Sequence, residues 1–308
     1  MKAIKLWVML TLLFAVLGCS KSSAPAETSE QLPTIEEINI LQKQNAAGEP
    51  IDDPETVFAE MTKYPTTVFG HNHIKLDHYQ VFRNMIPKLR GNGILVLGIE
   101  EPTSTQPILD SIMSGKTSAE ETTRLLKELN ADFKQSDFNK KYDPNPAIIH
   151  PTIALVLDWL NSGGIVAAID VPYIYDKTKK ENIYQTKIMY QAIRNNSSAL
   201  YESVKDVNIN NLDDHRDLRV ISEVRAAYMA SVLNTYRLKG VKTIAFLGYM
   251  HGLEKVKCGK TVSPSVVQIA RNYFNQEIFS LYPHQANGSH QFYKGHEWLG
   301  KYAYRASE

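Results

Sequence analysis

Short apolar runs alternate along the chain with longer segments in which apolar residues recur at helical spacing. In the short runs nearly every residue is apolar, which is typical of strands buried on both faces of a sheet. These runs cover residues 66–69, 94–99, 165–169 and 244–247. The other segments predict helices at residues 55–64, from 77 onward, and at 107–130, 151–161, 183–204, 213–238 and 264–274, with a last strand at 277–281. This alternation predicts an α/β fold: a single domain whose mostly parallel central sheet is flanked by helices on both faces.

The four apolar strands all end in ionisable side chains. These are His71 and His73, Glu100 and Glu101, Asp170, and His251. The first and the last strand end in the same pattern, a glycine followed three residues later by a histidine. Ligands of open α/β sheets bind at the carboxyl ends of the strands, where pKa values and metal affinity can be tuned. The pattern therefore predicts a functional site at this edge of the sheet.

Arg225 lies within the apolar stripe of the long predicted helix at residues 213–238. The stripe consists of Leu218, Ile221, Met229, Val232 and Tyr236. A guanidinium among apolar side chains needs an anionic partner, because burying it unpaired is costly. We therefore expect Arg225 to be buried and paired with Glu100 or with a bound anion. The alternative is that its side chain extends to solvent at the edge of the stripe.

Residues 1–18 have the pattern of a bacterial lipoprotein signal peptide. Lys2 and Lys5 precede an apolar run at residues 6–17, and residues 16–19, Val-Leu-Gly-Cys, resemble a lipobox. Cys19 is therefore the predicted lipidation site, and residues 19–50 are expected to be the lipidated cysteine and a flexible tether. The protein would then lie in the bacterial cell envelope, anchored to a lipid bilayer through Cys19. An ordinary secretory signal or a membrane anchor is the alternative.

Composition and net charge indicate which kinds of molecule the protein is expected to bind. The net charge of +1 offers no electrostatic case for binding nucleic acid. The chain has two cysteines, and with Cys19 lipidated the other, Cys258, is left as a free thiol with no internal disulfide. Residues 51–308 are long enough for one large α/β domain. We expect the ligand or substrate to be a small molecule that is partly anionic.

Together these motifs resemble a superfamily that includes ChaN-like haem-uptake lipoproteins, erythromycin esterases and the Tiki and TraB group of proteases. Its pattern begins with a strand and Gly-Glu-x-His, continues with a strand ending in Glu, and later has an Arg or Asp before Met-Ala and a strand closing in Gly-x-x-His. The matching positions here are Gly70 to His73, Glu100, Arg225 with Met229-Ala230, and Gly248 to His251. The resemblance covers residues 66–270 and identifies 51–308 as a ChaN- and erythromycin-esterase-like domain.

One departure from the superfamily pattern concerns the first motif, in which His71 replaces the glutamate. His71 is a candidate metal ligand, since imidazole binds zinc, iron, copper and nickel. Alternatively, it marks a chain that has lost catalysis and kept binding. The resemblance implies a divalent metal or haem as the cofactor. It also makes His78 and Tyr249 candidate cofactor ligands, and leaves esterase, metalloprotease and haem carrier open.

Two other motifs offer alternative interpretations. His71-x-His73 with Asp77-His78 is similar to the metal motif of the metallo-β-lactamase fold, but its spacing is two residues too long. A His-x-His after a first strand is also found in amidohydrolase barrels, which need about eight βα units. The sequence here predicts five or six strands, which is fewer than such a barrel needs. His150, just before the helix at 151–161, is interpreted as a helix cap or a surface residue, with a place facing the cleft as the alternative.

The sequence therefore favours hydrolysis of an ester or amide. We expect His73, Glu100, Arg225 and His251 to be catalytic, with His71, His73, His251 and Glu100 as the potential metal ligands. A neutral histidine would activate water directly or hold a metal, and Arg225 would stabilise developing negative charge. The alternatives are haem or metal binding without catalysis, and a structural lipoprotein.

Overall fold

The computed structural model describes most of the chain between residues 49 and 294. The described residues are 49–50, 54–71, 76–135, 150–176, 178, 181–207, 209–210, 218–252, 256–258, 261–286 and 289–294. The predicted signal peptide, Cys19 and nearly all of the predicted tether lie outside these residues, as does His73. Within the described ranges, no helix is both long enough and apolar enough to cross a membrane.

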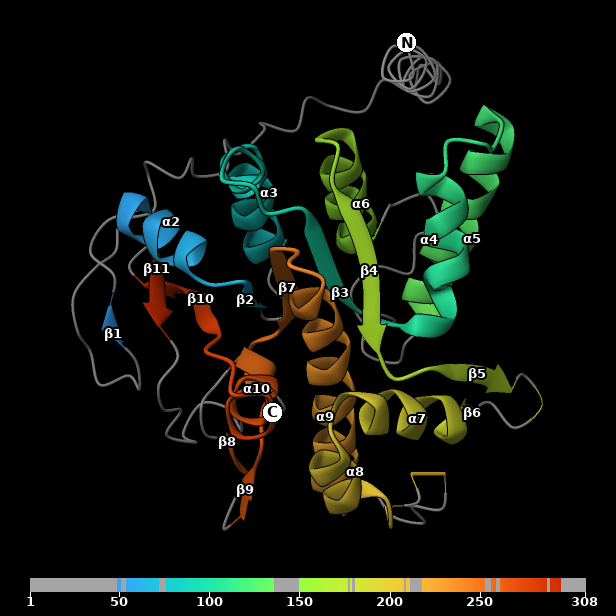
Figure 1. Cartoon of the computed structure of the whole chain (residues 1–308). Coiled ribbons are helices and arrows are strands. Elements are labelled where there is room, and N and C mark those ends of the chain that lie inside the picture. The colour runs from blue at the N-terminus through green and yellow to red at the C-terminus, as the bar shows by residue number, and fades with distance from the viewer. Residues whose placement is uncertain are drawn as a thin grey trace.

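One sheet organises the described part of the chain (Figure 1). Its strand order is β1-β11-β10-β2-β7-β3-β4. The strands are β1 (Glu49–Pro50), β2 (Thr66–His71), β3 (Val96–Pro102), β4 (Ile165–Asp170), β7 (Thr243–Gly248), β10 (Phe279–Ala286) and β11 (Ser289–Lys294). From β10 to β4 all neighbours are parallel, and β11 and β1 add antiparallel pairs at one edge. The predicted α/β fold with a mostly parallel sheet is therefore confirmed.

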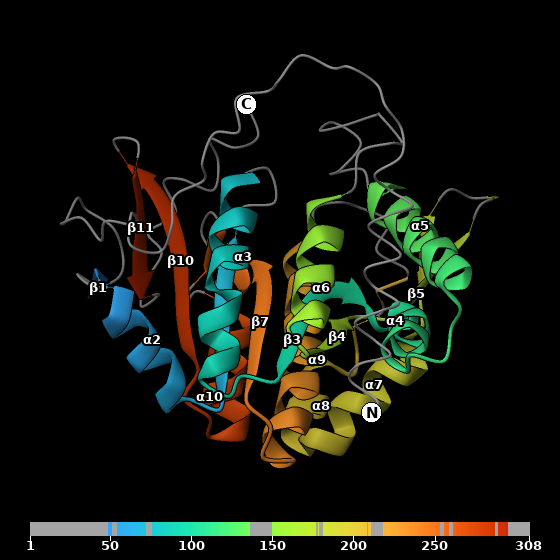
Figure 2. The same cartoon turned by 90° about the horizontal axis from the view of Figure 1, so that it is seen from above.

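Helices cover both faces of this sheet, with one group above it and one below it in Figure 1. The first group is α2 (Pro54–Lys63), α3 (Leu76–Gly91), α4 (Gln106–Met113), α5 (Ala119–Gln135) and α6 (Pro151–Asn161). The second group is α7 (Thr186–Asn196), α8 (Ser198–Val204), α9 (Leu218–Leu238) and α10 (Val266–Phe274). Figure 2 shows the strands between α3 and α6 on one side and α9 and α10 on the other.

The core consists of two apolar clusters, one on each face of the sheet. Because side chains alternate along a strand, successive residues of β2 enter different clusters. Phe69 packs against α3 and α6, whereas Val68 packs with α9 and α10. Every residue of β2 and β7 is buried. This double burial explains why β7 is a nearly continuous apolar run. In β2 the buried Thr66 and Thr67 hydroxyls are hydrogen-bonded, to Gln276 and to the Met61 carbonyl.

Several predicted elements differ from the structure in their limits. The helices predicted within residues 107–130 are α4 and α5, which are separated by a turn in which Gly115 has φ +61°, and α5 continues to Gln135. The helix predicted from residue 183 begins at Thr186, because Ile183 lies in a hairpin of β5 (Tyr173–Asp176) and β6 (Glu181–Tyr184). The hairpin of β8 (Val256–Cys258) and β9 (Thr261–Ser263) was not predicted. Short two-stranded ribbons give too weak a periodic signal to be recognised.

Candidate functional site

The register of the parallel strands gathers the predicted polar ends at one edge of the sheet. His71 is paired with Gly248 across β2 and β7, and Ile99 with Phe246 across β3 and β7. The pairing of β3 with β4 shifts register between Ile99 and Pro102. This irregularity contains Glu100 and Glu101 and interrupts strict alternation, as bulges near functional sites often do. Both carboxylates can therefore line the same pocket.

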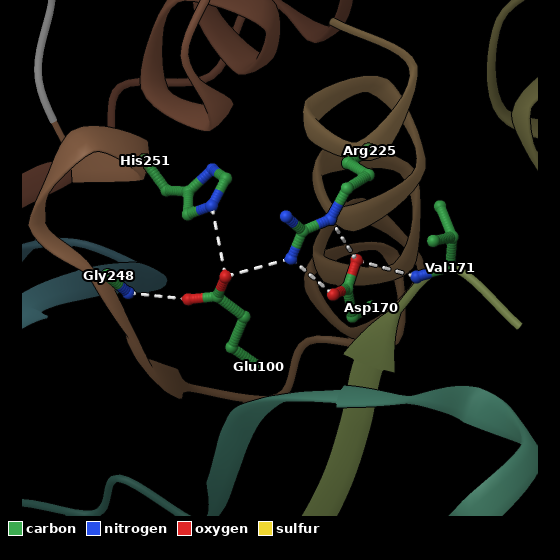
Figure 3. Close-up of polar contacts among 6 residues, drawn as sticks. All are labelled: Glu100, Asp170, Val171, Arg225, Gly248 and His251. Atoms are coloured by element: carbon green, nitrogen blue, oxygen red, sulfur yellow. Dashed lines mark hydrogen bonds and ion pairs between the residues drawn. The ribbon is translucent and has the colours of Figure 1, made fainter. Parts of the chain in front are cut away.

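Glu100 lies at the centre of a row of ionisable side chains that it forms with His251, Arg225 and Asp170 (Figure 3). Its Oε2 accepts a hydrogen bond from the Gly248 backbone N–H at 2.6 Å. Its Oε1 accepts one from Arg225 Nη2 at 2.9 Å and lies 3.2 Å from His251 Nε2. The Glu100 side chain is 10% exposed. A largely buried carboxylate with these partners is fixed in position.

Arg225 has two carboxylate partners, as Figure 3 shows. Besides Glu100, it binds Asp170 in a fork, with Nε 3.1 Å from Oδ1 and Nη2 2.5 Å from Oδ2. Burial would lower the pKa of Arg225, but Asp170 and Glu100 raise it above its ordinary value. The guanidinium therefore stays charged. The predicted pairing of Arg225 with Glu100 is confirmed, and Asp170 is the additional partner.

His251 lies on the short 3-10 helix η4 (Tyr249–Gly252), which directly follows β7. Gly252 allows this turn to pack closely on β2 and β10. A Cβ atom added at Gly252 would lie 2.5 Å from Ser280 Oγ and 3.2 Å from Val68 Cγ1. The close contact anchors the turn, and with it the imidazole that faces Glu100 in Figure 3.

A small pocket lies beside this row of side chains. Its volume is about 40 Å³, and it is lined by His71, Tyr79, Ile99, Glu100, Glu101, His150, Thr152 and Phe246. A volume of that size has room for a few water molecules or a small chemical group. Glu100 belongs both to the pocket wall and to the row of ionisable side chains. A molecule held in the pocket would therefore lie next to the Glu100 carboxylate.

Aromatic side chains contact His71 on two sides. Its ring stacks on Phe246 with centroids 4.0 Å apart, and its Nε2 lies 3.1 Å from the Tyr79 hydroxyl. Burial raises the pKa of Tyr79, Glu100 and Glu101 raise it further, and a hydrogen bond with Thr152 opposes them. The Tyr79 hydroxyl therefore stays protonated at neutral pH. Thr152, Tyr79 and His71 form a chain of polar contacts along one wall.

The other predicted site residues are placed less centrally. His78 is buried and Tyr249 is partly buried, but neither lines the pocket. Among the residues that the structure describes, no group of three His, Cys, Asp or Glu side chains could hold a metal ion. His71, Glu100 and His251 therefore do not form a metal site by themselves. The predicted metal set also includes His73, which lies outside the described residues.

The two predicted cofactors fit the pocket differently. Its histidines and carboxylates are suitable donors for a metal or for haem iron. Sites that enclose organic ligands usually measure about 300–1,000 Å³. A pocket of about 40 Å³ is too small to enclose a porphyrin. The donor chemistry fits a haem, and a pocket of this volume would hold its ligating side chains while the porphyrin lay largely outside.

Several contributors to the site were not predicted as such. Phe246 and Thr152 had no recognisable signal, because one is a strand residue and the other a helix residue in apolar surroundings. Asp170 was noticed as a strand end but not as a partner of Arg225. The N–H of Gly248 is a backbone group, so no side chain marks it in the sequence. The one indication of its role was the glycine of the second Gly-x-x-His pattern.

Comparisons with known proteins found similarity to solved structures only, at low sequence identity. No protein-family model matches the chain, and no curated protein matches its sequence. Similar solved structures include haem-binding ChaN of Campylobacter jejuni, which is 13% identical with a TM-score of 0.43, covering 79% of this chain and 92% of that one. A mutant of the erythromycin esterase EreC is 11% identical with a TM-score of 0.46, covering 80% of each chain. A succinoglycan biosynthesis protein is 11% identical with a TM-score of 0.45, covering 80% of this chain and 72% of that one.

Two larger toxin structures are also similar, at 12% and 13% identity with TM-scores of 0.42 and 0.39. The chain spans 38% of the length of a MARTX toxin effector domain from Vibrio vulnificus. It spans 27% of the length of a chain from the C-terminal region of Pasteurella multocida toxin. The structural neighbours thus include a ChaN protein and an erythromycin esterase, two of the groups that the sequence resembles.

Proposed function

We propose that this chain is a hydrolase in which Glu100 and His251 activate water for attack on an ester or amide bond of a small molecule. The observation that carries the proposal is the 3.2 Å contact between His251 Nε2 and a Glu100 carboxylate that Gly248 and Arg225 hold in place. A carboxylate that orients an imidazole is the arrangement that lets a neutral histidine act as a general base.

The proton path follows from this contact. With Nε2–H donating to Glu100 Oε1, Nδ1 of His251 is the nitrogen that accepts a proton. Water loses a proton to Nδ1 as its oxygen attacks the carbonyl carbon, and the carbonyl π electrons move to the oxygen. When the carbon–oxygen or carbon–nitrogen bond breaks, the leaving group takes that proton from His251. Glu100 stays ionised and stabilises the transient imidazolium.

The role proposed for Arg225 changes from that expected from the sequence. Its Nε and Nη2 are engaged by Asp170 and Glu100 at 2.5–3.1 Å. A guanidinium in such contacts acts on the reaction by holding Glu100. We therefore assign Arg225 as a positioning residue rather than as the group that binds the developing oxyanion.

Replacing His251 with asparagine is expected to lower kcat at least about 100-fold, because the general base is lost. The assay uses p-nitrophenyl acetate, erythromycin and an N-acyl p-nitroanilide as probes of ester, lactone and amide hydrolysis. Glu100→Gln keeps the shape of its side chain but removes the charge that stabilises the imidazolium, so it should also lose activity. Glu128→Gln is the matched control, since Glu128 is half-exposed on α5 and pairs with Arg124.

A His251→Asn protein that hydrolyses the same probe as fast as wild type would contradict this mechanism. The alternative function is haem binding without catalysis, and the presence of His71, Tyr79 and His150 in one pocket favours it. In that case a haem titration should change the Soret absorbance of a wild-type protein that turns over none of the three probes.

The proposed location is the bacterial cell envelope, with a lipid anchor at Cys19. The full chain expressed in bacteria should partition with membranes and incorporate labelled fatty acid, because residues 16–19 resemble a lipobox. Cys19→Ser should abolish the labelling, whereas Cys258→Ser, at the only other cysteine of the sequence, should leave it intact. An unlabelled, soluble wild-type protein would overturn the anchoring proposal.

A further inference from the structure

The edge strand β4 is covered by the side chains of a neighbouring helix, α4, which lies beside it in Figure 1. β4 is the last strand of the sheet and pairs on one side with β3. The Ile165 N–H donates to the Leu95 carbonyl on that side, so alternation turns the N–H and C=O groups of Val166 and Ala168 away from β3. Backbone groups of this kind, at an open sheet edge, can pair with a strand of another chain.

Two side chains of α4 bind these outward backbone groups. Gln106 Oε1 accepts a hydrogen bond from the Ala168 N–H at 2.7 Å, and Gln106 Nε2 donates to the Val166 carbonyl at 3.2 Å. Met113 Sδ, at the other end of α4, accepts the Val166 N–H at 3.3 Å. Asp110 Oδ1 accepts a second hydrogen bond from Gln106 Nε2 at 2.9 Å and thereby fixes the orientation of the amide. The Gln106 amide thus bonds to β4 as a neighbouring strand would.

The strand beneath this cover has no protection of its own. Residues 165–169, Ile-Val-Ala-Ala-Ile, contain no charge and no proline, which are the features that keep many exposed edge strands from pairing with other chains. A short, uncharged and apolar strand of this kind associates readily when it is exposed. Control of this edge therefore depends on the side chains that cover it.

The cover is held by few contacts. α4 has eight residues, all of them described, and only Leu109 among them is buried. A helix of this length is not stable in water by itself. Its position therefore depends on Leu109 and on the hydrogen bonds that Gln106 and Met113 make with β4.

We propose that Gln106 and Met113 keep this chain from pairing through β4 with a second copy of itself. The uncovered edge is self-complementary. In an antiparallel pair about a two-fold axis, Val166 of each copy faces Ala168 of the other, and each such pair of residues exchanges two hydrogen bonds. The partner that fits the edge is therefore a second copy of this chain, and pairing joins the two sheets into one. This association does not depend on hydrolysis.

Gln106→Leu is the decisive variant, because leucine is similar in size to glutamine and has no polar atom. Sedimentation velocity of the purified full chain in a mild detergent, over a wide range of protein concentration, should show monomeric wild type. The mass of Gln106→Leu should rise toward that of a dimer as its concentration increases. Gln191→Leu is the matched control and should stay monomeric. Gln191 is exposed on α7, and its Nε2 makes the same kind of four-residue contact, with Asn195 Oδ1 at 2.7 Å.

Hydrogen exchange of the Val166 and Ala168 amides, followed by NMR, shows where the two copies meet. At low concentration Gln106→Leu should speed exchange at Ala168 by about 5-fold, the equivalent of one hydrogen bond. Met113→Leu keeps the side-chain volume and should speed exchange at Val166 alone. At high concentration the Ala168 amide of Gln106→Leu should be protected again, because it then bonds to the second copy.

Three results would overturn the proposal. The first is a Gln106→Leu protein that stays monomeric at every concentration although its Ala168 amide exchanges fast. The second is a dimer in which that amide stays unprotected, because the copies would then meet elsewhere. The third is a wild type that dimerises as strongly as the variant. Circular dichroism checks that Gln106→Leu is folded. If it is not, Gln106→Asn takes its place, since its shorter amide cannot reach both backbone groups.

Discussion

Arg225→Leu is expected to lower the free energy of unfolding by about 3–5 kcal/mol, because it leaves two buried carboxylates without their shared cation. The side chains of Glu100 and Asp170 are 10% and 8% exposed and that of Arg225 is 28% exposed, so water can replace the guanidinium only in part. At about 2–4 °C per kcal/mol for a domain of this size, the Tm should fall by roughly 10 °C. Urea denaturation at 25 °C gives the free energy, and calorimetry gives the Tm.

Arg83→Leu is the matched control for this experiment. Arg83 also pairs with an aspartate, Asp158, at 2.6 Å, but the two side chains are 32% and 38% exposed. Exposed pairs of this kind contribute at most about 1 kcal/mol. Adding Asp170→Asn to Arg225→Leu should restore part of the lost stability, since one unpaired charge is removed. Equal and small losses in Arg225→Leu and Arg83→Leu would mean that Arg225 is not a buried ion-pair member.

Phe246→Ala should cost about 3–5 kcal/mol as well, the usual loss for truncating a buried phenylalanine. The Phe246 ring is 2% exposed and lies at the centre of an aromatic cluster. It stacks on Phe69 and His71 with centroids 5.6 and 4.0 Å apart, and meets Phe82 at 5.0 Å. Phe246→Leu keeps most of the volume and should lose about 1.5 kcal/mol or less. Urea denaturation again gives both values.

Phe274→Ala separates the stability effect from the effect on the pocket. Phe274 is buried in the other apolar cluster, on α10. Its truncation should destabilise the fold without changing the histidine signals of the pocket. Only Phe246→Ala should shift the ¹⁵N resonances of His71, because it removes the ring on which His71 stacks. An unshifted His71, or a loss of stability below about 1 kcal/mol, would show that this stack does not position the pocket wall.

Some helices and strands are longer or shorter in the structure than predicted, because the sequence signals at their ends are weak. The central strands were recognisable because each is an apolar run bounded by turns, and α6 was predicted with its observed limits, Pro151–Asn161. Ile183 was assigned to a helix because β6 has four residues and its pairing with β5 is set by contacts that no short periodic pattern records.

The contacts of the candidate site, like the limits of the helices and strands, could be predicted only in part. That Arg225 needs a carboxylate followed from its place among apolar residues, because an unpaired buried charge is too costly. Which carboxylates it meets did not follow, since Asp170 lies 55 residues away and Glu100 lies 125 residues away along the chain. In the proposed function Arg225, which both carboxylates engage, is therefore a residue that positions Glu100.

The sequence by itself determined the class of fold, the edge of the sheet at which polar groups collect, and the need to pair Arg225. These properties depend on local periodicity and on the cost of burying charge. Both can be read from a single segment of the sequence. Only the tertiary structure decided that His251 faces Glu100, that His71 stacks on Phe246 instead, and that His150 joins a pocket wall. Strand order and register set these contacts. They arise from packing among residues far apart in the chain, so no single stretch of sequence contains them.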